Sequence, residues 1–282
     1  MADGVGKFEQ FVKFGTDAYG LERLLRLLQA LVTILLFTPP TTTTITALLL
    51  LPPSLLPLLT PTTLTPLRKR LASLRQPLRF FRFLDSFASA WSALSTLQST
   101  TTTTTTPTTT NSSSGSNWAR RVTGWSDFGA RAFTGMYLLL ESCVFVEAVL
   151  DVPGLGVWGS PEVVRGLVVD GQRFWFVGLV CGIVGGVVRL VVEGDGERGG
   201  EKGGEKKGEG KKKGEGKGKV VRRLVADVMD LAVPGSVVGW VPLDPGTVGL
   251  LMLGSTVLTG MEVWERCGKD VAAAKAAVRE KR

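Results

Sequence analysis

An uncharged apolar run at residues 174–188 constrains this 282-residue chain more than any other feature. Arg189 lies close enough to its end for the side chain to reach an interface, so residues 174–192 are predicted to form a transmembrane helix. Three glycines recur at every fourth residue within it: Gly178, Gly182 and Gly186. Such spacing gathers the glycines on one helix face, where another helix can approach closely.

The segments around this run also have helical patterns. Residues 118–192 read as a helical region that ends in the transmembrane helix, although Glu141 and Glu147 argue against an earlier lipid-exposed span. Residues 220–264 read as a helix followed by a second apolar membrane segment at 246–263, which either crosses the bilayer or dips into it. A charged tail, 265–282, completes the chain.

Residues 67–98 read as a basic amphipathic segment. Its leucines and one phenylalanine follow a seven-residue rhythm and fall within roughly 80° of arc at 100° per residue. Basic side chains fill the gaps, and with Asp85 as the single acid the segment carries six basic residues and a net charge of +5. Burial among anionic headgroups suits this pattern. The predicted membrane-binding residues are Leu67, Arg68, Lys69, Arg70, Leu71, Leu74, Arg75, Leu78, Arg79, Phe81 and Arg82.

The second half of this segment places its apolar residues on another face. A straight helix cannot present both faces to one flat surface, and Pro77 lacks the N–H that would bond to residue 73. Two helical halves joined near Pro77 are therefore predicted. A calmodulin-type target, a nucleic-acid contact and an ordinary helix with a basic outer side remain alternatives for this segment.

The N-terminal region, residues 1–37, is predicted to be helical. Apolar residues recur at three- and four-residue steps, and the charged residues lie on the other side. An apolar stripe of this kind predicts a helix that faces a protein core. The stripe comprises Leu21, Leu24, Leu25, Leu28, Leu31, Val32 and Leu35.

Three tracts of biased composition separate these helical regions. A Thr/Pro/Leu insertion is expected at 38–66, a disordered Thr/Ser linker at 99–117 and a disordered Gly/Glu/Lys linker at 193–219. The predicted fold is therefore all-α: a membrane-associated helical protein with amphipathic helices and one or two transmembrane helices, interrupted by disordered linkers.

Composition excludes several functional classes. The chain contains no histidine, which removes Ser-His-Asp and Cys-His catalysis and most zinc sites. Its three cysteines are scattered, which is not a disulfide framework. The GxGxxG pattern at Gly154–Gly159 lacks a preceding strand and reads as a turn between helices rather than a dinucleotide site. No enzyme activity, catalytic residue, metal or cofactor is predicted.

The order of segments and several local strings resemble the peroxisomal biogenesis factor 11 family, especially its fungal branch. The N-terminal string 19–29, YGLERLLRLLQ, and the basic string 67–84 are two such matches. Arg173-Phe174-Trp175, at the start of the transmembrane segment, is the third. The fourth is 224–234, with Asp227 and Asp230, which leads to the glycine-rich segment closing at Gly260 and Trp264.

The resemblance implies a protein of the peroxisomal membrane with cytosolic termini. Members of this family elongate and help divide peroxisomes, self-associate, and recruit a fission adaptor and a dynamin-like GTPase. The expected partners are therefore a membrane with anionic lipids, further copies of the chain and these two fission proteins, with no nucleic acid. The net charge of +8 suits an anionic membrane surface.

Two other functions compete with membrane remodelling. A channel or transporter for small metabolites is the alternative that the same resemblance implies, and Glu141, Glu147 and Arg189 are its polar residues near apolar segments. A soluble nucleic-acid-binding protein is disfavoured, because the basic residues alternate with an apolar stripe and membrane-length segments follow.

Overall fold

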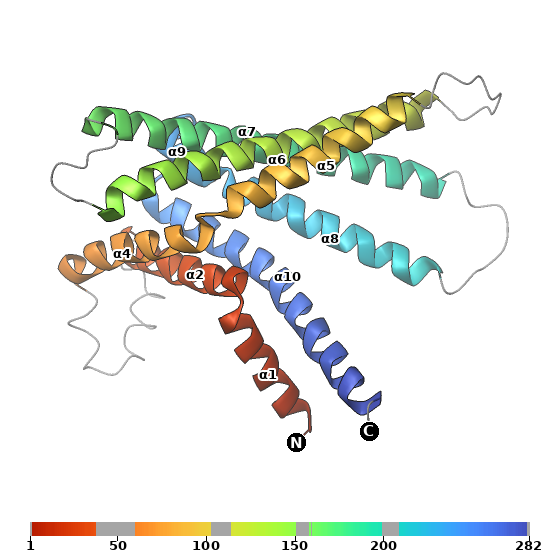
Figure 1. Cartoon of the computed structure of the whole chain (residues 1–282), viewed down its shortest axis with the longest axis horizontal. Coiled ribbons are helices and arrows are strands. Elements are labelled where there is room, and N and C mark those ends of the chain that lie inside the picture. The colour runs from red at the N-terminus through yellow and green to blue at the C-terminus, as the bar shows by residue number, and fades with distance from the viewer. Residues whose placement is uncertain are drawn as a thin grey trace. The chain divides into compact units, whose positions relative to one another are not determined.

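The structure, a computed structural model, describes residues 2–37, 60–102, 114–150, 158, 160–198 and 209–280. Every regular element in these ranges is an α-helix (Figure 1), so the predicted all-α fold is confirmed. The chain divides into two compact units: unit 1 comprises Met1–Leu78 and Pro242–Arg282, and unit 2 comprises Arg79–Val241. Much of each predicted linker lies outside the described residues, namely 38–59 of the tract 38–66, 103–113 of 99–117 and 199–208 of 193–219. Most of the glycine turn at 154–159 lies outside them as well.

Unit 1 is built from the two ends of the chain. Its helices are α1 (Ala2–Thr16), α2 (Ala18–Phe37), α4 (Pro61–Arg79, which reaches the boundary with unit 2) and α10 (Pro245–Glu280). Helix α2 packs along α10, and α1 packs against both. Where α1 meets α10, the Phe14 and Trp264 rings lie edge to face with centroids 5.7 Å apart, and the Gln10 amide donates to the Trp264 carbonyl at 2.8 Å.

Unit 2 holds the remaining helices: α5 (Arg82–Thr102), α6 (Ser114–Leu150), α7 (Pro161–Arg198), α8 (Glu209–Asp230) and α9 (Ala232–Val238). Helix α6 packs along both α5 and α7, and α7 also contacts α8 and α9. Stacked aromatic rings join α6 to α7: Phe133 with Phe174, and Tyr137 with Trp175 at a centroid distance of 5.1 Å. Gly239, at φ 82°, ends α9 in the left-handed conformation that glycine adopts most easily.

Three helices begin with the same kind of residue pair. Thr60-Pro61, Ser160-Pro161 and Asp244-Pro245 precede and open α4, α7 and α10. A side-chain oxygen at the first position caps free backbone N–H groups, and proline at the first helical position already has helical φ. At α10 the cap is complete, because the Asp244 carboxylate accepts from the Thr247 N–H at 2.8 Å.

Helix boundaries differ from the predicted ones in several places. Helix α4 begins at Pro61, so the last residues of the predicted Thr/Pro/Leu insertion are helical, and Leu64 is buried. It continues through Pro77 to Arg79, and the break before α5 falls at Phe80 and Phe81 rather than at Pro77. Helices α5, α6, α7 and α8 extend into the tracts expected to be linkers, and α10 continues through the charged tail to Glu280.

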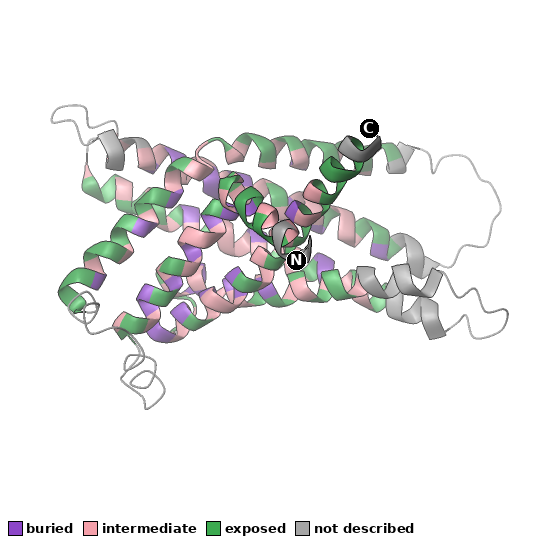
Figure 2. Cartoon of the chain, turned by 90° about the horizontal axis from the view of Figure 1, so that it is seen from below, coloured by how far each residue is buried: buried purple, intermediate pink, exposed green. Residues whose placement is uncertain are grey.

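The prediction that the leucine stripe of α2 faces a core holds for one edge of the stripe only: Val32 is buried and Leu25 packs against the same cluster, whereas the other edge is exposed. Leu28 is 47% exposed, and Leu21, Leu31 and Leu35 are also exposed. The buried side of α2 instead carries Glu22, at 3% exposure, together with the other buried positions Gly20, Arg26, Ala30, Val32 and Thr33. The charged residues Glu22 and Arg26 therefore lie inside unit 1, and four leucines of the stripe lie outside it. Figure 2 shows that buried and exposed positions alternate along the helices.

Gly20, at the junction of α1 and α2, is expected to tolerate no side chain. A Cβ there would overlap the carbonyl oxygen of Phe14 and lie 2.9 Å from its carbon, both backbone atoms. We expect Gly20→Ala to lower the free energy of unfolding by about 1–3 kcal/mol, as overpacking does. The control is Gly15→Ala, which meets no atom within 4 Å and should stabilise α1 by about 0.5–1 kcal/mol. Chemical denaturation of the purified protein in detergent compares them; equal effects would contradict this account of the junction.

The cap at the start of α10 should depend on pH. Its hydrogen bonds from Thr247 hold the pKa of Asp244 below its ordinary value of 3.8. A lowered pKa means that this stabilisation is fully present above pH 4 or so and is lost as pH falls through the lower, folded value. Hydrogen-exchange protection of the Thr247 amide should therefore hold from pH 7 to 5 and drop in stronger acid. Asp244→Ala should abolish this protection at neutral pH, whereas Glu262→Ala should not.

Candidate membrane-binding surface

Within the described residues, two helices are long and apolar enough to cross a membrane: Pro161–Val192 of α7 and Pro245–Ala277 of α10. They contain the two membrane segments predicted from the sequence. In the core helix of a soluble protein the apolar residues are mostly covered, but here only 17% and 28% of the most apolar 18-residue stretches are buried. Apolar side chains left on the surface of such helices are suited to lipid.

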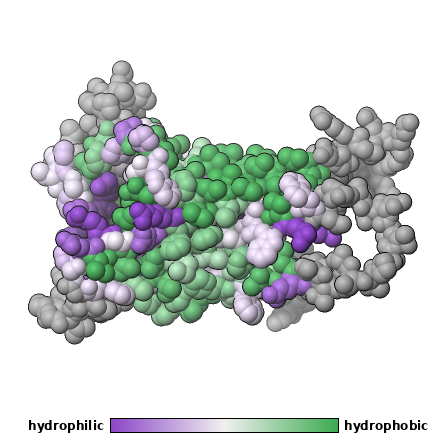
Figure 3. Space-filling view, turned by 90° about the horizontal axis from the view of Figure 1, so that it is seen from above, coloured by the Kyte–Doolittle hydropathy of each residue, from purple (hydrophilic) through white to green (hydrophobic). Residues whose placement is uncertain are grey.

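Four exposed valines of α7 form a continuous apolar stripe. They recur at four- and three-residue steps on a single helix face: Val180, Val184, Val187 and Val191. A shorter stripe on α8 has the same character, with Val221, Val225 and Val228 exposed. Figure 3 shows a broad hydrophobic area across the middle of one face, with hydrophilic residues gathered toward its ends.

The predicted amphipathic ridge of α4 splits into an exposed edge and a buried edge. Leu67 and Leu74 are 43% and 56% exposed, and at 100° per residue they point within about 20° of each other. Leu71 is only 7% exposed, because it packs with Val32 and Leu64 in the core of unit 1. Leu71 therefore supports the position of α4, and only the exposed edge can meet a membrane.

The basic residues of α4 divide in the same way. Lys69 and Arg70 are exposed, and half-buried Arg68 lies over the Phe37 ring at 5.2 Å. Arg75 is buried, and its guanidinium donates to the Glu22 carboxylate at 2.7 and 3.2 Å and to the Gln29 amide oxygen at 2.6 Å. This residue was predicted to contact lipid headgroups, but the structure uses it to fasten α4 to α2.

The last predicted membrane-binding residues lie at or beyond the end of α4. Leu78 is half-buried. Arg79 donates to the Glu141 carboxylate at 2.6 Å and to the Tyr137 hydroxyl at 3.1 Å, both on α6. Phe81 is exposed between the helices, and Arg82, the first residue of α5, is half-buried. Arg79 is therefore held by unit 2 and is taken out of the candidate surface.

The three glycines of α7 face helices of the same chain. A Cβ on Gly178 would lie 3.2–3.3 Å from Thr134 and the Ala130 carbonyl of α6. One on Gly182 would lie 3.3 Å from the Asp227 carboxylate of α8, and one on Gly186 equally close to Leu224. The glycine face therefore packs unit 2 together, and a second copy of the chain would have to bind elsewhere.

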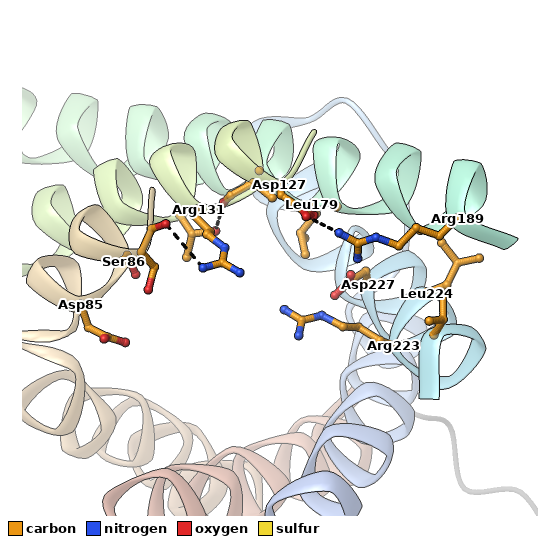
Figure 4. A pocket seen from close by; sticks show the side chains of 16 residues that line it. Asp85, Ser86, Asp127, Arg131, Leu179, Arg189, Arg223, Leu224 and Asp227 are labelled. Carbon is orange, nitrogen blue, oxygen red and sulfur yellow. Dashed lines mark hydrogen bonds and ion pairs between the residues drawn. The ribbon is translucent and has the colours of Figure 1, made fainter. Parts of the chain in front are cut away.

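The same glycines line a polar cavity of about 380 Å³ in unit 2, bounded by α5, α6, α7 and α8. Its charged lining residues are three arginines and three aspartates: Asp85, Asp127, Asp227, Arg131, Arg189 and Arg223. Asp127 and Arg189 form an ion pair, and Figure 4 shows Arg131 and Arg223 pointing into the cavity from opposite sides. The formal charges in the lining therefore balance.

Sequence reasoning missed the partners that fix the arginines of α4. Glu22, Tyr137 and Glu141 all lie far from them in the chain. One signal was available: Glu22 interrupts an otherwise apolar and basic helix, and a lone acid there calls for a cationic partner.

The membrane-length helices and the exposed apolar faces define a helical, membrane-associated protein. The family model of Peroxisomal biogenesis factor 11 (PEX11) matches residues 108–264, which contain α6, α7, α8, α9 and part of α10. The chain therefore belongs to the PEX11 family. No curated protein and no solved structure matches the chain.

Family membership makes the chain a peroxisome biogenesis factor and indicates the peroxisomal membrane as its location. The family is not a known enzyme family. The matched residues include the strings at 173–175 and 224–234 that carried the resemblance, whereas the strings at 19–29 and 67–84 lie before the match.

Proposed function

We propose that this PEX11-family protein elongates the peroxisomal membrane and promotes its division by inserting the exposed edge of α4 among lipid headgroups. The observation that carries the proposal is the position of Leu67 and Leu74, which are exposed together with Arg70. At 100° per residue Lys69 lies on the opposite side of α4. Helix α4 is fastened to α2, which packs on the membrane-length α10. Shallow insertion of such a helix expands one leaflet relative to the other.

The energies suit a reversible contact. Burying one exposed leucine contributes up to about 1.5–3 kcal/mol, and each basic residue near an anionic surface contributes about 1 kcal/mol. A few such residues bind one copy weakly, so bending requires many copies held together. Self-association on a surface other than the glycine face, and recruitment of a fission adaptor and a dynamin-like GTPase, complete the proposal. Both termini are placed in the cytosol, where these partners are.

The test replaces the two exposed leucines with glutamate and expresses each variant in cells that lack their own PEX11-family protein. We expect the full chain to restore elongated and dividing peroxisomes, and Leu67→Glu/Leu74→Glu to reach the membrane without restoring them. Thr62→Glu/Ser73→Glu is the matched control, because it adds the same charge at exposed positions on the other side of α4. Equal rescue by both double variants would refute insertion of this edge.

A channel for small metabolites is the second candidate function. The cavity in unit 2 favours it, because charged residues gather beside a helix long enough to cross a membrane. Arg131→Gln/Arg223→Gln should then slow the efflux of a small anionic dye from vesicles several-fold. Vesicles that hold the dye equally well with and without the protein would exclude the channel.

A further inference from the structure

We propose that α2 is a second lipid-contacting helix, and that lipid acyl chains cover its exposed face. The face that we assign to lipid, the α2 leucine face, consists of Leu21, Leu28, Leu31 and Leu35. At 100° per residue these four positions fall within about 80° of arc. All four are exposed, although the helix packs along both α10 and α4.

The two sides of α2 are reversed relative to a helix of a water-soluble protein. Such a helix turns its apolar stripe to the core and its charges to water. In α2 the charged residues Glu22 and Arg26 are 3% and 5% exposed, and Thr33 is buried beside them. A helix whose charged residues lie inside with Ala30 and Val32, and whose outer side carries four leucines, matches apolar surroundings.

Mean hydropathy alone does not identify α2 as a lipid-contacting helix, because Glu22, Arg23 and Arg26 fall within its first three turns. These charges do not face outward. Glu22 pairs with Arg75 of α4 at 2.7 Å and lies 3.6 Å from the half-buried Arg23. Ionisable residues at membrane depth face the protein interior and pair with one another, as Glu22 and Arg75 do.

The contact between α2 and the membrane-length α10 indicates that lipid covers the α2 leucine face. A Cβ on Gly249 of α10 would lie 3.1 Å from Ile34, so the two helices are in close contact within unit 1. The exposed residues of α10 include Leu250, Val257 and Met261, which are apolar like those of α2. With its 20 residues, α2 is about 30 Å long, comparable with the hydrocarbon thickness of a bilayer. Lipid around α10 therefore extends over α2.

This inference rests on the membrane location and not on remodelling. The test uses the full chain in vesicles of phosphatidylcholine and anionic phosphatidylserine, with its three cysteines replaced by alanine. A nitroxide is attached to a new cysteine at position 28 or 31, and its collisions with oxygen and with a water-soluble nickel chelate are measured. Three reference positions calibrate the result: exposed Lys69 for water, exposed Val257 of α10 for lipid and fully buried Ala30 for protein interior.

We expect labels at Leu28 and Leu31 to match the one at Val257, with oxygen collisions several-fold more frequent than nickel collisions. A match to Lys69 would place the α2 leucine face in water, and a match to Ala30 would show that another protein surface, such as a second copy, covers it. Either result overturns the inference. If the label at Val257 also matched the label at Lys69, the membrane location of α10 itself would be refuted. The label at Val257 therefore distinguishes failure of the membrane location from failure of the inference about α2.

Discussion

Replacing Arg75 with alanine is expected to destabilise unit 1 by about 3–5 kcal/mol, because the buried Glu22 carboxylate loses its 2.7 Å ion pair, while Arg23 stays 3.6 Å away. Only 4% of the Glu22 side chain is exposed, so water cannot replace the lost contacts. The Gln29 amide also loses a hydrogen bond. Thermal unfolding of the purified protein in detergent, followed by circular dichroism, measures the loss.

Two further variants separate the ion pair from simple truncation. Arg70→Ala removes an exposed arginine from the same helix and should change stability by less than about 0.5 kcal/mol. Glu22→Leu/Arg75→Leu removes both charges and should recover most of the stability, since apolar replacements of a buried pair are often tolerated. An unfolding temperature for Arg75→Ala equal to that of Arg70→Ala would contradict the buried clamp.

Leucine in place of Gly178 should force α7 away from α6. Even the first added carbon would lie 3.3 Å from the Ala130 carbonyl oxygen and from the Thr134 backbone nitrogen, neither of which can move by itself. Gly178 also lines the cavity of unit 2, so the rest of the side chain would have to turn into that cavity. We expect a loss of about 1–3 kcal/mol in unfolding free energy, the range typical of overpacking.

Gly166 provides the matched control for this substitution. It lies in the same helix, and a Cβ there would meet no atom within 4 Å. Gly166→Leu should therefore leave the unfolding temperature unchanged or raise it, since glycine weakens a helix interior. Similar unfolding temperatures for the two variants would show that the glycine face of α7 is not packed against α6.

The helical architecture follows from sequence patterns more readily than the helix boundaries do. Apolar periodicity located the regions that became α2, α7 and α10. The starts of α4 and α7 were missed, although Thr60-Pro61 and Ser160-Pro161 have the same cap-and-proline chemistry as Asp244-Pro245. Composition obscured them, because threonine and proline are also the residues of low-complexity tracts.

Side-chain environments were harder to predict, for a physical reason. Periodicity shows that α2 and α4 each have an apolar stripe, but not whether protein or lipid covers it, because both are apolar. The answer depends on which charged side chains find partners inside the protein. Arg75 looked like a headgroup contact in isolation and became an interior residue once Glu22 lay opposite it. Leu71 is buried on the same helix as Arg75, whereas Leu67 and Leu74 are exposed.

The cavity of unit 2 illustrates the same limit. Asp85, Asp127 and Arg223 come from three different helices, and no local pattern links them. The match to the PEX11 family covers two of these three residues and leaves out α4 and α5. For α4, the role of the exposed edge is therefore argued from its geometry.

Vesicle shape tests this role most directly. Full-length protein is reconstituted into anionic vesicles loaded with a small dye, and electron microscopy and dye release are recorded together. Tubules in the wild type and with Thr62→Glu/Ser73→Glu, but spheres with Leu67→Glu/Leu74→Glu, are the result that insertion of the α4 edge predicts. Tubules of equal number with all three proteins, or dye release from vesicles that stay spherical, would contradict it.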